Sequence, residues 1–128
     1  MKIEHIAIWV NDLEGMRSFY QTYFNMQCSK KYQNSAKGFS SYFLSFDSGA
    51  RLEIMKKKDI INETKNKGIT NGLTHLAISV GSKEAVDTCT DCLRHDGFTI
   101  YGEPRTTGDG YYESIILDPE GNHIEITE

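Results

Sequence analysis

The amino-acid sequence predicts an α+β fold in which two βαβββ modules are joined in a single domain, residues 1–128. Three observations lead to this prediction. The apolar run HIAIWV at residues 5–10 returns almost unchanged as HLAISV at residues 75–80. Each run is followed by a segment with apolar residues at helical spacing, and each segment is followed by paired strand-like runs around a tight turn. The first module is expected to cover about residues 1–68 and the second about residues 69–128.

Alternation along the two apolar runs separates an aliphatic face from a mixed face, because successive side chains of a strand point to opposite sides. The aliphatic residues of the two runs are Ile6, Ile8 and Val10, and Leu76, Ile78 and Val80. We expect a helix to cover the aliphatic face in each module. His5 and His75 then point to the opposite face of their sheets.

Two amphipathic helices are expected, one in each module, over residues 12–24 and 82–96. Ser82 suits the N-cap of the second helix, because its hydroxyl can accept a hydrogen bond from a backbone N–H that has no partner within the helix. Gly97 suits the C-terminal end, where the backbone often turns left-handed.

A hairpin is expected to close each module. The predicted strands are residues 42–46 and 51–55 in the first module and 113–117 and 123–127 in the second, with a further strand before each hairpin, around residues 27–32 and 98–103. The second hairpin turns through Asp118-Pro119-Glu120-Gly121, which has proline and glycine at positions that a tight turn favours. Each module therefore follows the order β-α-β-β-β.

Each closing strand carries one glutamate between two aliphatic residues, Glu53 in the first module and Glu125 in the second. His5 precedes Glu53 by 48 positions, and His75 precedes Glu125 by 50. A single histidine or glutamate at such a position is usually structural, but the repeated pair favours an N₂O₂ site for a divalent metal ion. These ligands suit zinc, nickel, cobalt, iron or manganese and do not choose among them. His123 lies on the same face as Glu125 and is interpreted as a rim residue.

Composition and charge narrow the range of partners. The chain is 25% charged and 38% hydrophobic, as ordinary globular proteins are, and its net charge is −4. Its one basic run, Lys56 to Lys58, is short and is interpreted as a solvated loop, so nucleic acid is not an expected partner. No apolar run is long enough to cross a bilayer and no signal-peptide pattern is present, so we expect a cytoplasmic location and no membrane partner.

The three cysteines, Cys28, Cys89 and Cys92, agree with that expectation, because an odd number without a framework pattern does not suggest disulfides. Cys89 and Cys92 form a CxxC motif inside the second expected helix. They are interpreted as packing residues of that helix, because a redox CxxC normally opens a helix and no second Cys/His pair stands nearby to complete a zinc site.

The chain resembles the vicinal oxygen chelate superfamily, also called the glyoxalase/bleomycin resistance/dioxygenase superfamily. The resemblance covers essentially the whole chain. It rests on HIAIWV, on RLEI at residues 51–54, on THLAISV, and on the closing DPEGNHIEI, which matches the D-P-x-G-x-x-x-E ending common in this family. The resemblance implies that the two modules form an open, cup-shaped mixed sheet with the helices outside and a metal ion at the bottom. His5, Glu53, His75 and Glu125 match its four ligand positions.

Within the superfamily the ligand set resembles that of bacterial glyoxalase I (lactoylglutathione lyase), which also has His, Glu, His and Glu. Ring-cleaving dioxygenases and fosfomycin-modifying members have no ligand at the position of Glu53, so this residue favours Lewis-acid chemistry over oxygen activation. Bacterial glyoxalase I has an arginine four residues after its first histidine that helps to bind the glutathione carboxylate. Here that residue is Trp9, which would suit an apolar or flat part of a substrate.

The resemblance implies a small-molecule substrate with two neighbouring oxygens, and a proton transfer next to its carbonyl through a metal-bound enediolate. Glu125 is the expected general base, and Glu53 is the alternative. Two other functions stay open: an epimerase of the methylmalonyl-CoA epimerase type, and a non-catalytic small-molecule binding or resistance protein. By analogy with the family we expect a homodimer, with the site built either within one chain or across two.

Residues 106–112 form the other candidate region. Gly108 and Gly110 flank Asp109, and two tyrosines follow, Tyr111 and Tyr112. The segment is either a mobile loop whose tyrosines contact the substrate or a plain hairpin turn.

Overall fold

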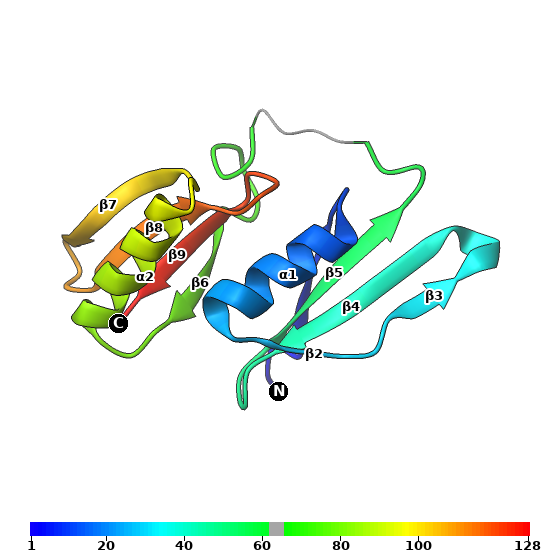
Figure 1. Cartoon of the computed structure of the whole chain (residues 1–128), viewed down its shortest axis with the longest axis horizontal. Coiled ribbons are helices and arrows are strands. Elements are labelled where there is room, and N and C mark those ends of the chain that lie inside the picture. Colours follow the sequence, from blue (N-terminus) through cyan, green and yellow to red (C-terminus); the bar gives the residue numbers. More distant parts are fainter. Residues whose placement is uncertain (62–65) are drawn as a thin grey trace. The chain divides into compact units, whose positions relative to one another are not determined.

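The computed structural model describes residues 1–61 and 66–128, and it divides into two compact units, Met1–Asn62 and Glu63–Glu128 (Figure 1). The described residues contain two α-helices and nine strands in two mixed sheets that are not closed. This confirms the predicted α+β fold class. No helix in the described part of the chain is both long enough and apolar enough to span a membrane.

The first unit has one helix and a five-stranded sheet. Its elements are β1 (His5–Trp9), α1 (Leu13–Phe24), β2 (Gln27–Cys28), β3 (Tyr32–Asn34), a 3₁₀ turn (Ser35–Lys37), β4 (Phe39–Ser45) and β5 (Arg51–Lys57). The strand order is β1-β5-β4-β2, and β3 also pairs with β4. β1 runs parallel to β5, and the other pairs are antiparallel.

The second unit repeats this topology with four strands. Its elements are β6 (His75–Ser79), α2 (Lys83–His95), β7 (Ile100–Thr106), β8 (Tyr112–Leu117) and β9 (His123–Thr127). The order is β6-β9-β8-β7, with β6 parallel to β9 and the other pairs antiparallel. In both units the first strand of the module therefore lies beside the last one, which brings distant sequence segments together.

The helix ends follow local capping chemistry. The Asp12 side chain accepts a hydrogen bond from the backbone N–H of Gly15 at 3.0 Å, and Ser82 accepts one from Ala85 at 3.2 Å, which confirms the predicted N-cap. After α2, Gly97 adopts a positive φ of 86°, a conformation that glycine takes without steric cost.

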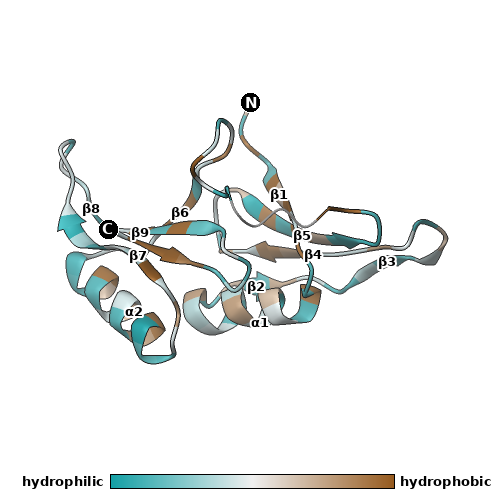
Figure 2. Cartoon of the chain, turned by 90° about the horizontal axis from the view of Figure 1, so that it is seen from above, coloured by the Kyte–Doolittle hydropathy of each residue, from teal (hydrophilic) through white to brown (hydrophobic). Residues whose placement is uncertain are grey.

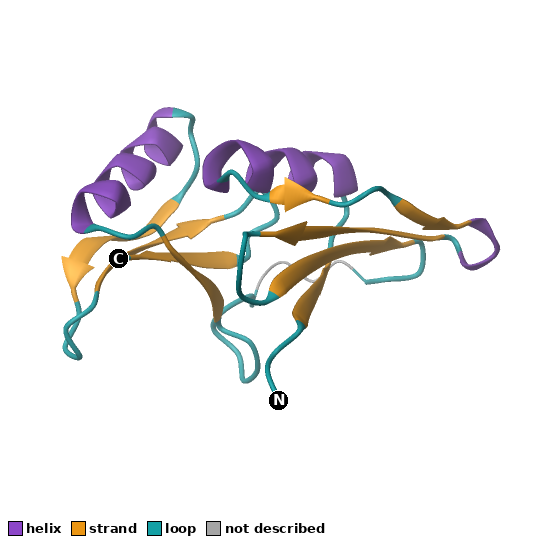
Figure 3. Cartoon of the chain, turned by 90° about the horizontal axis from the view of Figure 1, so that it is seen from below, coloured by secondary structure: helices purple, strands orange, loops and turns teal. Residues whose placement is uncertain are grey.

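Each helix covers one face of the sheet in its own unit (Figure 3). Exposed and half-buried residues alternate along β1, as expected for a strand with one covered face, and its ribbon carries both teal and brown in Figure 2. The fully buried core side chains of the first unit are Met16, Tyr20, Leu44 and Ile54, and those of the second are Val86, Leu93, Ile116, Ile124 and Ile126. Burial of each large apolar side chain contributes about 1.5–3 kcal/mol, which fixes the helix on the aliphatic face.

Two details of the strands differ from the sequence expectation. The strand expected around residues 27–32 is two short strands, β2 and β3, because they pair with opposite ends of β4. β5 continues through Lys57, since Lys56 and Lys57 pair with the beginning of β4, so these two exposed lysines extend a strand and do not form a loop.

The segment just before β6 belongs to the second unit and contacts other parts of it. The Lys67 ammonium donates a hydrogen bond to the Glu120 carbonyl at 2.9 Å, and Gly68 packs against the ring of His123. The sequence interpretation placed residues 67 and 68 at the end of the first module, whereas here they lie in the second unit.

Candidate metal and substrate site

The face of each sheet that its helix leaves uncovered is called the open face below. In the first unit, Leu52 and Ile54 are buried beneath α1, while His5 and Glu53 lie on the open face. The parallel register pairs Ala7 with Glu53, so His5 is a diagonal neighbour of Glu53 across β1 and β5. Its Nε2 atom lies 3.9 Å from Oε2 of Glu53. The first unit thus brings its predicted His–Glu pair together.

The second unit holds its pair in the same register. Ala77 pairs with Glu125, which makes His75 the diagonal neighbour of Glu125 across β6 and β9. Nε2 of His75 lies 3.3 Å from Oε2 of Glu125. In both pairs the histidine is more exposed than the glutamate, so the donor atoms remain accessible from the open face.

These distances can be compared with those in a metal site. Two ligand atoms that each lie about 2.1 Å from one ion are about 3.0–3.4 Å apart at octahedral or tetrahedral angles. The His75–Glu125 pair is in this range, and the His5–Glu53 pair needs a shift of about half an ångström to reach it. Imidazole nitrogen and carboxylate oxygen are suitable donors for a borderline divalent ion.

Within the residues that the structure describes, no group of three or more His, Cys, Asp or Glu side chains is arranged to hold a metal ion. Within these residues, neither His–Glu pair is therefore joined by a third donor in a metal-holding arrangement, and the four-ligand site predicted from the sequence would need both pairs.

His123 is more enclosed than a rim residue would be. It is 8% exposed, and its ring packs against the Tyr101 ring at a tilt of 43°, with the ring centroids 4.3 Å apart. A Cβ atom on Gly68 would lie only 2.6 Å from its Nδ1 atom, so the backbone at Gly68 packs directly on the imidazole. This packing gives His123 a structural contact as well as its place on the open face.

Glu113 is a buried carboxyl on the same open face, and the sequence interpretation did not identify it. Its register partner is Thr127, two residues from Glu125 on β9. The Arg105 guanidinium donates a hydrogen bond to Oε1 of Glu113 at 3.1 Å. Burial raises the pKa of the Glu113 carboxyl, the nearby charge of Glu125 raises it further, and Arg105 opposes both effects.

No local sequence signal pointed to Glu113, because its role depends on the pairing of β7 with β8. Two register shifts in β7 bring Arg105 opposite Glu113. In the first unit the equivalent position is Ser41, which pairs with Met55 as Glu113 pairs with Thr127. Only the second unit therefore has an additional carboxyl beside its His–Glu pair at this position.

Trp9 is the last residue of β1 and lies on the open face of the first unit, 41% exposed. Its ring meets Phe39 edge-on at 6.1 Å, and Phe39 contacts Tyr32 at 6.0 Å. This aromatic cluster, Trp9, Phe39 and Tyr32, makes one end of the open face apolar.

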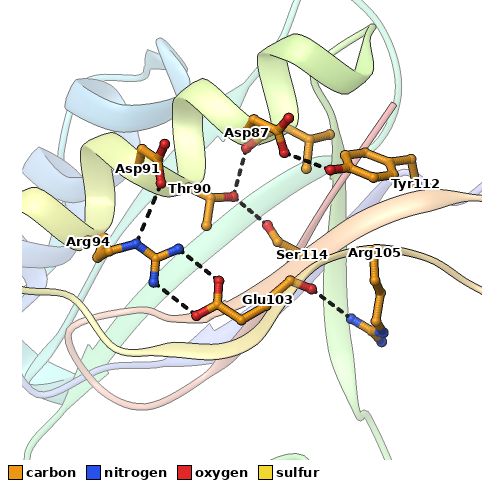
Figure 4. Close-up of polar contacts among 9 residues, drawn as sticks. Asp87, Thr90, Asp91, Arg94, Glu103, Arg105, Tyr112 and Ser114 are labelled. Carbon is orange, nitrogen blue, oxygen red and sulfur yellow. Dashed lines mark hydrogen bonds and ion pairs between the residues drawn. The ribbon is translucent and has the colours of Figure 1, made fainter.

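The two tyrosines of the 106–112 segment lie in different environments. Tyr112 donates a hydrogen bond to Asp87 of α2 at 2.8 Å, and its ring lies beneath the Lys83 ammonium, so it sits on the helix-covered face (Figure 4). The structure does not bring Tyr112 together with the His75–Glu125 pair. Tyr111 is exposed, and its carbonyl accepts a hydrogen bond from the backbone N–H of Thr107 at 2.8 Å. The segment is thus a hairpin turn between β7 and β8.

The whole chain is similar to known proteins. The chain is 30% identical to the uncharacterized protein YqjT of Bacillus subtilis (strain 168) over 127 residues, which cover 97% of this chain and 96% of that protein. A solved structure of a possible glyoxalase from Bacillus cereus is 26% identical, with a TM-score of 0.74 over 100% of this chain and 99% of that one.

Two enzyme structures share the fold at lower identity. Glyoxalase I from Zea mays is 21% identical with a TM-score of 0.81 over 98% of this chain, which spans only 44% of the maize chain. The trypanothione-dependent glyoxalase I of Leishmania major is also 21% identical, with a TM-score of 0.80 over 100% of this chain and 86% of that one. The family model described as Glyoxalase/Bleomycin resistance protein/Dioxygenase superfamily matches residues 2–126, and the chain belongs to this superfamily.

Proposed function

We propose that this protein is a metal-dependent lyase or isomerase of the glyoxalase I type. His5, Glu53, His75 and Glu125 would hold a divalent ion, which is zinc, nickel, cobalt, iron or manganese. The observation that carries the proposal is the repetition of the His–Glu pair in the same register on the open face of both units. A purely structural role does not explain why both residues and their diagonal register recur in the two units.

The bound ion would supply Lewis-acid polarisation of a substrate with two neighbouring oxygens. The protein's own residues then have to move a proton at the carbon next to the carbonyl. We assign this role to Glu125, with Glu53 as the alternative. The Glu113 carboxyl interacts with Glu125, so a proton taken up by Glu125 has a second carboxyl nearby. Glu53 faces Phe43 across the sheet, and the position equivalent to Glu113 is Ser41.

The aromatic cluster suggests what part of the substrate the first unit binds. Trp9 and Phe39 offer apolar ring surface where bacterial glyoxalase I has its carboxylate-binding arginine, although Lys57 pairs with Phe39 across β4 and β5. We propose that this end of the open face contacts an apolar or flat portion of the substrate, and that glutathione is not the necessary cosubstrate.

Metal analysis of the purified protein, followed by an assay with methylglyoxal, tests the proposed function. The assay is run without thiol, with glutathione and with other thiols. Glyoxalase I-type activity predicts turnover that requires both the metal and a thiol. If the metal-loaded protein does not convert methylglyoxal but exchanges the α-proton of a carbonyl substrate, the result would support an epimerase instead. Failure to bind any of the five metals would overturn the proposal and support a binding or resistance protein.

The base assignment has its own test. Glu125→Gln is expected to keep part of its metal and to lose about 10²–10⁴-fold in turnover, the usual contribution of a general base. Ser79→Ala, on the same open face and exposed, is the matched control and is expected to keep full activity. Normal turnover by Glu125→Gln would show that the assignment is wrong.

We also propose a homodimer, and mixing variants tests whether the site is shared between chains. His5→Ala and His75→Ala are each expected to lose the site. If two chains share the site, a mixed dimer of the two variants regains one intact ligand set, and activity returns on mixing. If one chain builds the whole site, mixing restores nothing.

A further inference from the structure

Glu4 precedes the first proposed ligand and contacts its imidazole ring. Oε2 of Glu4 lies 2.5 Å from Nδ1 of His5. We propose that Glu4 is a positioning residue: its carboxylate holds the His5 proton on Nδ1 and thereby directs the lone pair of Nε2 toward a metal ion beside Glu53. This inference rests on the metal site proposed above and adds a residue outside the ligand set.

Arg51 fixes the carboxylate from the other side. Its Nη2 atom donates a hydrogen bond to Oε1 of Glu4, and its backbone N–H donates to the Glu4 carbonyl at 3.0 Å. The guanidinium carbon lies 4.0 Å from the centre of the Phe43 ring. Because Arg51 pairs with His5 across β1 and β5, the same strand pairing that forms the site also holds Glu4 in place.

The His5 ring is restrained in both position and orientation. Phe43 meets it edge-on, with the ring centroids 5.4 Å apart and the planes at 86°. A carboxylate oxygen accepts hydrogen bonds and cannot donate one, so the contact with Glu4 requires the proton to be on Nδ1. In the neutral ring Nε2 is then an acceptor, and it faces the acceptor Oε2 of Glu53 at 3.9 Å. Two acceptors in this arrangement are stabilised by a cation between them.

The second unit lacks this device at the equivalent positions. Thr74 precedes His75, and His123 replaces Arg51 as the cross-strand partner. Neither residue carries a carboxylate. The two halves of the ligand set therefore differ in their support: His5 is oriented by a Glu4–Arg51 pair, and His75 is not oriented in this way.

The first experiment reads the tautomer of His5 in the metal-free protein, by ¹⁵N NMR at a pH well above the ordinary histidine pKa of about 6.5. We expect the proton on Nδ1 in the wild-type protein and on Nε2, the usual position in free histidine, in Glu4→Ala. Thr74→Ala is the matched control and should leave His5 unchanged. A proton on Nε2 of His5 in the wild-type protein would overturn the inference.

The second experiment measures zinc affinity by competition with a chromophoric chelator. Glu4→Ala is expected to bind zinc about 10–100-fold more weakly, the usual effect of losing such a partner, and Glu4→Gln should fall between it and the wild type. Thr74→Ala should bind as the wild type does. Glu4 is largely exposed, so both Glu4 variants are expected to fold, which thermal melting checks.

The outcomes separate the two proposals. A wild-type protein that binds no divalent metal would contradict the proposed function, while the tautomer measurement would still decide whether Glu4 orients His5. A wild-type protein that binds zinc no more tightly than Glu4→Ala does would contradict the role of Glu4 and leave the proposed function intact.

Discussion

Nε2 of His75 lies 3.3 Å from Oε2 of Glu125, on the face of the second sheet that α2 does not cover. The corresponding atoms of His5 and Glu53 are 3.9 Å apart. Both distances follow from one rule of strand pairing, in which the first residue of the first strand is the diagonal neighbour of the third residue of the last strand. Each copy of the module therefore supplies one His–Glu pair, half of the proposed ligand set.

His75→Ala removes one proposed donor and should lower the bound metal content. We expect at least the 10–100-fold loss of affinity that even an outer-shell change causes. The measurement is metal content by mass spectrometry after dialysis against a fixed free zinc concentration. Ser79→Ala, two pleats along the same strand face, should retain wild-type metal. Equal metal content in the two variants would show that His75 is not a ligand.

Trp9→Ala should affect substrate binding more than folding, because the indole is 41% exposed. We expect KM to rise for substrates with an aromatic or long apolar group and to change little for methylglyoxal. Trp9→Phe keeps an aromatic ring against Phe39 and should retain most of the wild-type KM. An equal change in KM for apolar and small substrates would contradict this role.

Glu103→Gln should make thermal stability less dependent on pH. Arg94 of α2 donates two hydrogen bonds to Glu103 of β7, at 3.0 and 2.8 Å, and these lower the pKa of the Glu103 carboxyl (Figure 4). A carboxyl whose pKa is lower in the folded state stabilises the fold above its unfolded-state pKa, and this contribution is lost as the pH falls through the folded-state value.

The variant should therefore melt below the wild type at neutral pH, and the difference in Tm should shrink as the pH falls below about 4. Scanning calorimetry across this range provides the measurement. Asp59→Asn removes a charge from the exposed turn after β5 and should show no such trend. A constant difference in Tm at all pH values would mean that the ion pair does not act through the Glu103 charge.

Gly68→Ala should destabilise the protein more than Gly72→Ala. Both glycines have positive φ, 75° and 131°, so alanine is strained at either position. Only at Gly68 would the new Cβ meet another group, the His123 imidazole at 2.6 Å, whereas nothing lies within 4 Å at Gly72. We expect an additional loss of about 1–3 kcal/mol in the free energy of unfolding, from urea titration. Equal losses would show that the loop moves away from His123 at little cost.

Much of the fold could be predicted from the sequence because its signals are local. The alternation in HIAIWV and HLAISV separates a covered face from an open one, and burial of Ile78 beside exposed Ser79 confirms it. Ser82 caps α2 through a contact three residues away. The sequence also predicted the pairs His5–Glu53 and His75–Glu125, which the structure holds together, although their metal role stays a prediction.

The tertiary structure decided what depends on contacts between distant segments. Tyr112 donates a hydrogen bond to Asp87 of α2, and Arg105 donates one to Glu113 because β7 shifts register twice against β8. The contact between Glu4 and Arg51 depends on the parallel pairing of β1 with β5, which brings the two residues together. A sequence period reports which side chains share a face of one strand, but which residues meet across strands is set by register, and register is fixed by the packing of the whole sheet.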